Sequence, residues 1–250
     1  MTNKVEVTKP LTKKSFPKPS DNMVTINEPE SAAAEAFRIL RTNISLRDFD
    51  NKIKVINVIS STSGESKSTI VSNLAYVFSQ LGKRVLLIDL DLRASSLHKK
   101  LRLKNKLGIS EVLSNGCTLK EAIIGYAPRL DVLLAGKKNP YASELLESKA
   151  FKNFLIAARS AYDLVLLDCP PVGLVSDGII VSSQCDGTLL CVGCNIVDKK
   201  ELEHTRDLLS SIKEINVLGI VMTRSERTKK YYGSNYGYGY GYGYGSEKKK

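Results

Sequence analysis

The chain has 250 residues, 42% of them hydrophobic and 25% charged, with a formal net charge of +11 at pH 7. That length favours one large domain with a full-sized core. No apolar run approaches the roughly 18 to 20 residues of a membrane span, and residues 1–20 lack the apolar segment of a signal peptide. Five cysteines, an odd number, fit a reduced compartment better than a disulfide framework. We therefore expect a cytoplasmic protein.

The positive charge is concentrated at the two ends of the chain. Residues 1–27 carry a net charge of +3 and residues 224–250 a net charge of +5, which leaves +3 for residues 28–223. Basic tails of this kind are usually solvated, and attraction to an anionic membrane surface is the alternative. We expect no nucleic-acid partner, because the body of the chain is nearly balanced.

The first amphipathic stretch after the N-terminal segment is "NEPESAAAEAFRILRTNISL". It predicts a helix capped by Asn27 or Ser31, with Pro29 in its first turn. Its charged residues Glu35, Arg38 and Arg41 lie at i, i+3 and i+6 and share one stripe of the helix. Taken alone, such a stripe is most often a solvated face.

Apolar runs then alternate with amphipathic stretches along the chain. The expected strands are 54–60, 84–90, 130–136, 162–168, 187–193 and 215–223, and the expected helices lie near 67–81, 109–114, 118–124, 143–160, 175–183 and 198–213. Runs of Val, Ile and Leu without polar alternation belong to strands covered on both faces. The pattern predicts a doubly wound α/β fold with a mostly parallel sheet and helices on both faces. Ligands in such folds bind at the carboxyl ends of the strands.

The segment "SSTSGESKST" (60–69) lies between an expected strand and an expected helix, the setting of a phosphate-binding loop. Backbone N–H groups would point at the phosphates, Lys67 would supply a cation and the Ser68 hydroxyl would bind Mg²⁺. Ser61 and Ser66 stand where the general pattern has glycines. The expected nucleotide-binding residues here are Ser63, Gly64, Glu65, Ser66, Lys67, Ser68 and Thr69.

Two acidic motifs follow at the ends of expected strands. "VLLIDLDLR" carries Asp89 and Asp91, which share a face because they are two residues apart on a strand. "LVLLDCPP" places Asp168 where a Walker B carboxylate would lie. Capping of loops is the alternative role for the first pair. Together with the loop at 60–69, these carboxylates predict a site for a nucleotide and Mg²⁺ in a P-loop NTPase fold.

The C-terminal segment "YYGSNYGYGYGYGYGSEKKK" cannot build a packed core, because it alternates glycine and tyrosine. Composition alone would favour a low-complexity tail. The segment holds seven of the eleven tyrosines of the chain, which are Tyr231, Tyr232, Tyr236, Tyr238, Tyr240, Tyr242 and Tyr244.

These motifs, in this order, resemble the bacterial tyrosine kinases of capsular and exopolysaccharide synthesis, in their stand-alone cytoplasmic form. The resemblance runs from about residue 30 to the C-terminus. It implies that Lys67, Asp89 and Asp91 are catalytic, with Asp89 beside the incoming tyrosine hydroxyl. It also implies that Ser68, Asp91 and Asp168 hold Mg²⁺ directly or through water.

The same resemblance implies how the kinase is organised. Glu35, Arg38 and Arg41 match an oligomerisation motif, so a ring homo-oligomer is expected in which each subunit offers its tyrosine cluster to the next. Further expected partners are a membrane-bound activator, which recruits the kinase to the inner face of the membrane through its cytoplasmic tail, and a tyrosine phosphatase. The expected segments are a flexible basic region (1–27), a kinase domain (28–224) and a disordered tyrosine-rich tail (225–250).

The chain departs from the family pattern at several positions. Ser63 and Ser66 stand where proline and glycine are usual, Cys169 where threonine is usual, and Thr223 where an asparagine would meet the adenine. If position 66 needs a positive φ, serine costs on the order of 1 kcal/mol there. Two other functions therefore stay open, a P-loop ATPase switch of the Min/Par type and a nucleotide-binding scaffold with weak catalysis.

Overall fold

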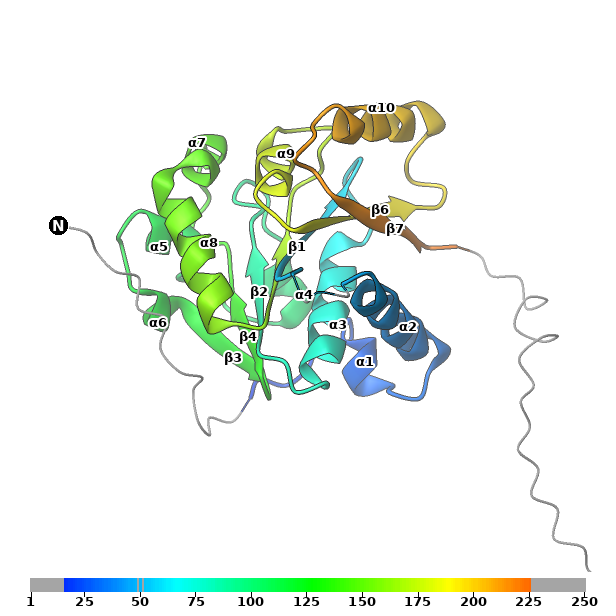
Figure 1. The fold of residues 1–250 in the computed structure, drawn as a ribbon. Helices are drawn as coiled ribbons and strands as arrows, with labels where there is room; N and C mark the ends of the chain where they lie inside the picture. The colour runs from blue at the N-terminus through cyan, green and yellow to red at the C-terminus, as the bar shows by residue number, and fades with distance from the viewer. Residues whose placement is uncertain (1–15, 49, 51, 226–250) are drawn as a thin grey trace, which may run out of the picture.

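The structure, a computed structural model, describes residues 16–48, 50 and 52–225 (Figure 1). A seven-stranded sheet runs through it in the order β3-β4-β2-β5-β1-β6-β7. Its strands are β1 (Val55–Ser60), β2 (Val85–Asp89), β3 (Ile123–Ala127), β4 (Leu130–Leu133), β5 (Leu164–Asp168), β6 (Gly187–Gly193) and β7 (Val217–Thr223). Among these described strands, only β3 is antiparallel to its neighbour. The predicted α/β fold with a mostly parallel sheet is confirmed.

Helices cover both faces of the sheet (Figure 1). They are α1 (Val24–Asn27), α2 (Ala32–Arg47), α3 (Lys67–Ser79), α4 (Leu97–Leu101), α5 (Ile109–Leu113), α6 (Leu119–Ala122), α7 (Ala142–Glu147), α8 (Lys149–Ala161), α9 (Asp177–Ser182) and α10 (Lys199–Ser210). Among the residues that the structure describes, no helix combines the length and hydropathy needed to cross a bilayer.

Two hydrophobic cores lie on opposite faces of the sheet. Along β1, Val55 and Ile59 belong to the core under α5, α7, α8 and α9, whereas Ile56 and Val58 belong to the core under α1 to α4. All six residues of β1 are buried. A central strand that is covered on both sides is mostly apolar, which explains the hydrophobic runs of the sequence. The two polar residues of β1, Asn57 and Ser60, form side-chain hydrogen bonds.

The folded body begins earlier than we predicted. We expected residues 1–27 to be flexible, whereas Met23 and Thr25 are buried against α3. The side chain of Asn73 in α3 accepts hydrogen bonds from the Thr25 amide (3.1 Å) and hydroxyl (2.8 Å). The buried side chain of Asn73 satisfies the polar groups of Thr25, and hydropathy patterns do not reveal such a contact. The part of the segment before residue 16 lies outside the described residues.

The start of α2 follows one of the two predicted caps. Ser31 is the N-cap, and its Oγ accepts a hydrogen bond from the Ala34 amide at 3.1 Å. Asn27 instead ends the short helix α1, and Pro29 precedes the cap rather than entering the first turn. A serine hydroxyl at this position satisfies one of the free N–H groups of the helix end.

Two helical predictions need correction. The stretch 118–124 ends its helix at Ala122 and continues as β3, which pairs with β4 across a short turn. The stretch 143–160 is two helices, because Ser148 stops α7 and caps α8 by accepting from the Phe151 amide at 3.2 Å. Periodicity detects neither change, since both depend on local capping and on strand pairing.

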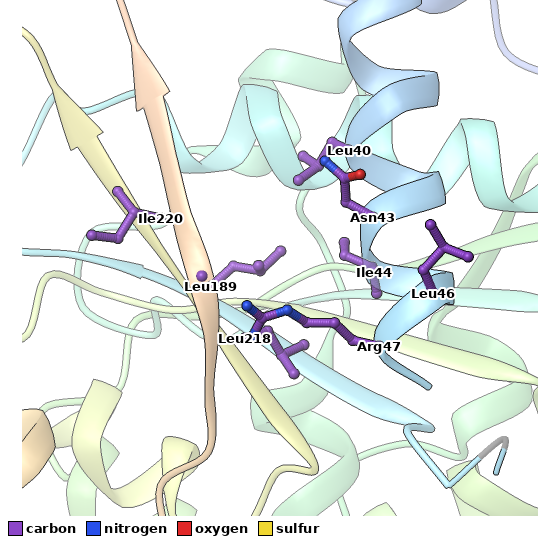
Figure 2. A pocket seen from close by; sticks show the side chains of 9 residues that line it. Leu40, Asn43, Ile44, Leu46, Arg47, Leu189, Leu218 and Ile220 are labelled. Atoms are coloured by element: carbon purple, nitrogen blue, oxygen red, sulfur yellow. The ribbon is translucent and has the colours of Figure 1, made fainter. Parts of the chain in front are cut away.

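A cavity of about 320 Å³ lies between α2 and the edge formed by β6 and β7 (Figure 2). Its lining is mainly apolar and consists of Leu40, Asn43, Ile44, Leu46, Arg47, Leu189, Leu218, Gly219 and Ile220. None of these residues belongs to the phosphate-binding loop or to the acidic motifs. The cavity therefore marks the packing of α2 on the sheet edge, away from the expected chemistry.

Candidate active site

The three predicted motifs meet at the carboxyl ends of three neighbouring strands. In the sheet order, β5 lies between β1 and β2. The loop after β1 carries the phosphate-binding residues, β2 ends at Asp89, and β5 ends at Asp168. Asp89 and Asp168 are direct register partners. Strand order thus brings together residues that are separated by about a hundred positions in the sequence.

The loop between β1 and α3 contains two left-handed residues. Gly64 has φ = 85°, and Ser66, which directly precedes α3, has φ = 68° and ψ = 19°. Position 66 therefore needs a positive φ, which glycine adopts freely and serine adopts at a cost of about 1 to 2 kcal/mol. Ser63 and Gly64 are exposed at the tip of the loop, and Thr69 is half-buried in the first turn of α3.

Lys67 and Ser68 open α3, and only 9% of each is exposed. The Lys67 ammonium donates to the Ser60 hydroxyl at 3.0 Å. The Ser68 hydroxyl lies 3.0 Å from the Ser96 hydroxyl. A cation and a hydroxyl at a helix N-terminus, where backbone N–H groups are free, form a suitable cradle for phosphate.

Asp89 is fully buried at the end of β2. Its Oδ1 accepts from the Asp91 amide at 3.1 Å, and its Oδ2 accepts from the Ser95 hydroxyl at 2.6 Å. Burial first, and then the nearby charge of Asp168, raise the pKa of Asp89 well above its ordinary value. A carboxylate with a raised pKa is suited to accept a proton from a hydroxyl group.

Asp168 is 2% exposed, and its Oδ1 is buried with no hydrogen-bond partner among the described residues. Burial raises the pKa of Asp168 to about 6, against the opposing effect of the Lys67 charge. A buried carboxylate oxygen without a partner is costly unless a cation satisfies it. Together with the Ser68 hydroxyl, it fits Mg²⁺, which prefers oxygen ligands.

Asp91, the third carboxylate, is half-buried. Its Oδ1 accepts from the Ala94 amide at 2.8 Å and closes the turn after β2. Asp91 and Asp168 are close enough that the charge of Asp91 helps to raise the pKa of Asp168. The same carboxylate thus serves the predicted loop-capping role and lies beside the predicted metal ligand.

Glu65 and Thr223 are both buried and contact each other. The Thr223 hydroxyl at the end of β7 donates to the Glu65 backbone carbonyl at 3.1 Å. The Glu65 carboxylate accepts two backbone N–H groups of the protein itself. Glu65 therefore does not present its side chain to the phosphates, although its position in the loop agrees with the motif.

Arg93 links the turn after β2, which carries Asp91, to the helices α7 and α9. Its guanidinium binds both oxygens of Asp177 at the start of α9, at 2.7 and 3.2 Å, and the Ser143 hydroxyl of α7 at 3.0 Å. Asp177 is fully buried. Arg93 therefore anchors the turn that carries Asp91 and lies in a structural ion pair rather than on the phosphate cradle.

The three residues of the expected oligomerisation motif differ in their surroundings. Glu35 and Arg38 form an exposed ion pair at 2.8 Å on α2. Arg41 instead donates from Nη1 to the Val77 carbonyl near the end of α3 at 2.9 Å. Two members of the stripe are thus available on the surface, and the third joins α2 to the body of the same subunit. The seven tail tyrosines lie outside the described residues.

Several residues at the site were not identified from the sequence. Ser60 binds Lys67, Ser95 binds Asp89, Ser96 binds Ser68, and Asp177 holds Arg93. Ser95 and Ser96 follow the acidic motif directly, so their place after a strand end was an available signal. Serine and aspartate are common in loops, which is why that signal was weak.

Several known proteins resemble this chain in sequence and in fold. Residues 53–218 match the family described as AAA domain. The tyrosine-protein kinase YwqD of Bacillus subtilis is 35% identical over 218 residues, covering 85% of this chain and 92% of the relative. The septum site-determining protein MinD of Pyrococcus horikoshii, solved with Mg-ADP, shares the fold at a TM-score of 0.58 and 20% identity, covering 71% of this chain and 72% of that one.

Two solved structures are more similar than MinD. The chimeric protein CapA2B2 superposes with a TM-score of 0.77 at 31% identity, covering 83% of this chain and 91% of that one. The kinase domain of the Escherichia coli tyrosine kinase ETK superposes with a TM-score of 0.75 at 28% identity, covering 89% and 84%. The chain belongs to the bacterial tyrosine kinases, a P-loop family, as the sequence motifs indicated.

Proposed function

We propose that this protein is an ATP-dependent tyrosine autokinase that phosphorylates its own C-terminal tyrosine cluster and thereby regulates polysaccharide synthesis and export. One observation carries the proposal. In a chain of the tyrosine kinase family, the loop that ends at Lys67 and Ser68 lies beside two register-paired buried carboxylates, Asp89 and Asp168. This is an arrangement for binding a nucleotide and moving a phosphoryl group.

The nucleotide phosphates bind to the backbone N–H groups at the start of α3 and to the Lys67 ammonium. Lys67 is held at the base of the loop by Ser60, and its positive charge lowers the pKa of Asp168. Ser68, Asp91 and Asp168 are the residues that would hold Mg²⁺. When bound there, the metal supplies positive charge that neutralises the phosphate oxygens.

Asp89 accepts the proton of the attacking tyrosine. The tyrosine oxygen forms a bond to the γ-phosphorus, the bond from that phosphorus to ADP breaks, and the phenol proton passes to the Asp89 carboxylate. Because Asp89 is fully buried, the side chains that cover it must move as the tyrosine enters. Its Oδ2 accepts from the Ser95 hydroxyl and keeps a second lone pair for the phenol. The Asp91 amide keeps the carboxylate oriented through Oδ1.

The tyrosine cluster follows β7 in the chain. Because β7 runs parallel to β6 and β6 runs parallel to β1, β7 ends at the same edge of the sheet as the phosphate-binding loop. A chain that leaves this edge begins on the side where the chemistry takes place. Its tyrosines are phosphorylated in trans within a ring homo-oligomer that forms through Glu35 and Arg38 on the surface of α2.

Phosphorylation reverses the charge of the tail. Residues 224–250 carry a net charge of +5, and each phosphate adds about 1.5 to 2 negative charges. Accumulated negative charge on neighbouring tails opposes the ring and favours dissociation. A membrane-bound activator of polysaccharide synthesis brings the kinase to the inner face of the membrane and starts this cycle, and a tyrosine phosphatase resets it.

Asp89→Asn tests the catalytic assignment. The variant keeps the size of the side chain but removes its capacity to accept a proton. It should bind MgADP like the wild type and yield no phosphotyrosine by mass spectrometry. Phosphotyrosine at wild-type levels in the purified variant would refute the role of Asp89.

Transfer between subunits has a separate test. A full-length variant with all seven tail tyrosines replaced by phenylalanine keeps an intact site but has no acceptor. Mixed with full-length Lys67→Met, which has an acceptor but no active site, it should phosphorylate the tail of the Lys67→Met protein. Absence of phosphate in this mixture, with active wild type alongside, would indicate transfer within one subunit.

A weakly catalytic scaffold remains the second candidate, and one observation favours it. Ser66 adopts φ = 68°, a conformation that serine reaches only with strain. If this strain misplaces the loop, restoring glycine should increase turnover by a large factor. The MinD-like switch gains no such support, because at 20% identity the likeness extends to the fold alone.

A further inference from the structure

Glu65 is a fully buried acidic residue inside the phosphate-binding loop. Its Oε1 accepts from the Thr62 amide at 2.8 Å, at the start of the loop. Its Oε2 accepts from the buried amide of Gly193 at 2.7 Å, at the end of β6. Both carboxylate oxygens are therefore occupied by backbone donors, and one of these donors belongs to a neighbouring strand.

The backbone of the same residue makes a second link. The Glu65 carbonyl accepts the hydroxyl of Thr223 at 3.1 Å, at the end of β7. The Thr223 carbonyl in turn accepts from the Cys194 amide at 2.9 Å, directly after β6. One residue of the loop thus ties the segment after β1 to the carboxyl ends of β6 and β7.

The contact with β6 is also tight. A β-carbon at Gly193 would lie 3.3 Å from Glu65 Cγ and 3.1 Å from the side chain of Ile196. The glycine therefore permits the close approach that brings its amide to the carboxylate. A buried carboxylate is tolerated when hydrogen bonds satisfy it, and each oxygen of Glu65 accepts one backbone N–H group.

Glu65 directly precedes Ser66, whose left-handed conformation costs energy that the surroundings must supply. Fixed on one side by the carboxylate and by the carbonyl bond to Thr223, and on the other by the start of α3, Ser66 has little freedom to relax. The direction of the loop N–H groups follows from this conformation. A loop held in place before the nucleotide arrives loses less entropy on binding.

We propose that Glu65 is a positioning residue that pre-organises the phosphate-binding loop by joining it to the ends of β6 and β7. It acts through Thr62, Gly193 and Thr223 and does not touch the phosphates. The inference rests on the proposed function in that the loop must bind a nucleotide. Its direct consequence is nucleotide affinity, which is measured without any phosphoryl transfer.

Glu65→Gln is the sharpest variant, because both partners of the carboxylate are N–H donors. An amide side chain has one acceptor oxygen and one NH₂ donor, so it can satisfy Thr62 or Gly193 but not both. The shape of the side chain is nearly unchanged. Any effect therefore reports the lost acceptor rather than a cavity.

Glu111→Gln is the matched control. Glu111 also accepts two backbone N–H groups from different segments, Gly108 at 2.9 Å and Lys137 at 3.1 Å. It lies in α5, outside the phosphate-binding loop and the acidic motifs. Glu111→Gln removes the same kind of link, a carboxylate that accepts two backbone N–H groups, and leaves the nucleotide site unchanged.

The measurements are calorimetric titration with MgADP, thermal unfolding without nucleotide, and ATP kinetics. Glu65→Gln should raise the Kd for MgADP and the KM for ATP by about tenfold or more, with turnover at saturating ATP within about threefold of wild type. Glu111→Gln should leave both affinities unchanged. If Glu65→Gln only lowers the unfolding temperature, as Glu111→Gln does, and leaves the MgADP affinity intact, the positioning role is refuted.

A measurement on the wild-type protein guards against a variant that does not fold. The amides of Thr62 and Gly193 should be protected from hydrogen exchange in the absence of nucleotide, because Glu65 already holds them. Exchange at both amides as fast as in an unfolded chain would overturn the proposal. If wild type binds MgADP but makes no phosphotyrosine, the kinase assignment fails while the affinity test of Glu65 still stands.

Discussion

Asp89 and Asp168 are register partners at the carboxyl ends of the adjacent parallel strands β2 and β5, and both carboxylates are buried. Each raises the cost of ionising the other, because two negative charges share a site that excludes water. Lys67 offsets part of this cost at Asp168. In the proposed mechanism, Asp168 of this pair holds a cation and Asp89 accepts a proton, so the stability of the nucleotide-free protein is linked to both roles.

Asp168→Asn should stabilise the nucleotide-free protein at pH 7. Burial raises the pKa of Asp168 from 3.8 to about 6, so the folded state loses stability as the pH rises through this range. The gain should be roughly 1 to 3 kcal/mol at pH 7 and should shrink towards pH 4.5, where the native carboxyl is protonated. Chemical denaturation at both pH values measures it.

The exposed Asp207 provides the control. Asp207→Asn should change stability by less than about 0.5 kcal/mol at either pH, because its carboxylate is solvated. A loss of stability in Asp168→Asn at pH 7 would show that the native carboxylate is well compensated without a cation.

Ser95→Ala should make phosphoryl transfer more sensitive to pH. The Ser95 hydroxyl donates to Asp89 and lowers its pKa, so removing it raises that pKa further. Less of the proton acceptor is then ionised at pH 7. We expect a lower initial rate than wild type at pH 7 and a smaller reduction at pH 8.5. A rate that rises, or falls equally at both pH values, would contradict this account.

Ser66→Gly should relieve the left-handed strain at the end of the loop. Serine at φ = 68° costs the folded state about 1 to 2 kcal/mol, which glycine would remove. Glycine also increases the conformational entropy of the unfolded chain, and this offsets part of the stabilisation. We expect a net stabilisation of about 1 kcal/mol or less, with turnover within about threefold of wild type. An increase of a hundredfold in turnover would instead support the weakly catalytic scaffold.

Alanine substitutions on α2 should separate assembly from stability. Glu35→Ala with Arg38→Ala removes an exposed ion pair and should change stability by less than about 1 kcal/mol while abolishing the large species in light scattering. Arg41→Ala also breaks the bond to the Val77 carbonyl and should cost about 1 kcal/mol in addition. Intact large oligomers in the double variant would exclude these two residues from the interface.

Much of the fold was readable from the sequence because the central strands are apolar on both faces. The runs at 84–90 and 162–168 became β2 and β5, and their terminal aspartates met as strand order required. β3 was missed because its residues continue directly from a short helix and are only partly buried. The packing of residues 16–27 was missed because it depends on Asn73, a polar residue of a distant helix.

The sequence predicted which principal residues lie together at the strand ends, but not the contacts that support them. Lys67, Ser68, Asp89 and Asp168 lie together because each motif sits at a strand end. The inward direction of the Glu65 carboxylate depends on Gly193, 128 residues away in the sequence. The separation of Arg41 from Glu35 and Arg38 depends on where α2 crosses α3. Neither contact can be predicted from the spacing of residues within one motif, because each depends on a distant segment of the chain.

The most direct test of the central claim is a map of phosphate on the full-length protein after incubation with ATP and Mg²⁺, by intact mass and peptide mass spectrometry. Lys67→Met serves as the inactive control, and Lys152→Met, an exposed position on α8, as the matched substitution. The account predicts several phosphates on the tyrosines between 231 and 244 in wild type and Lys152→Met, and none in Lys67→Met. Clear nucleotide binding by wild type without any phosphotyrosine, in the presence of its activator, would contradict it.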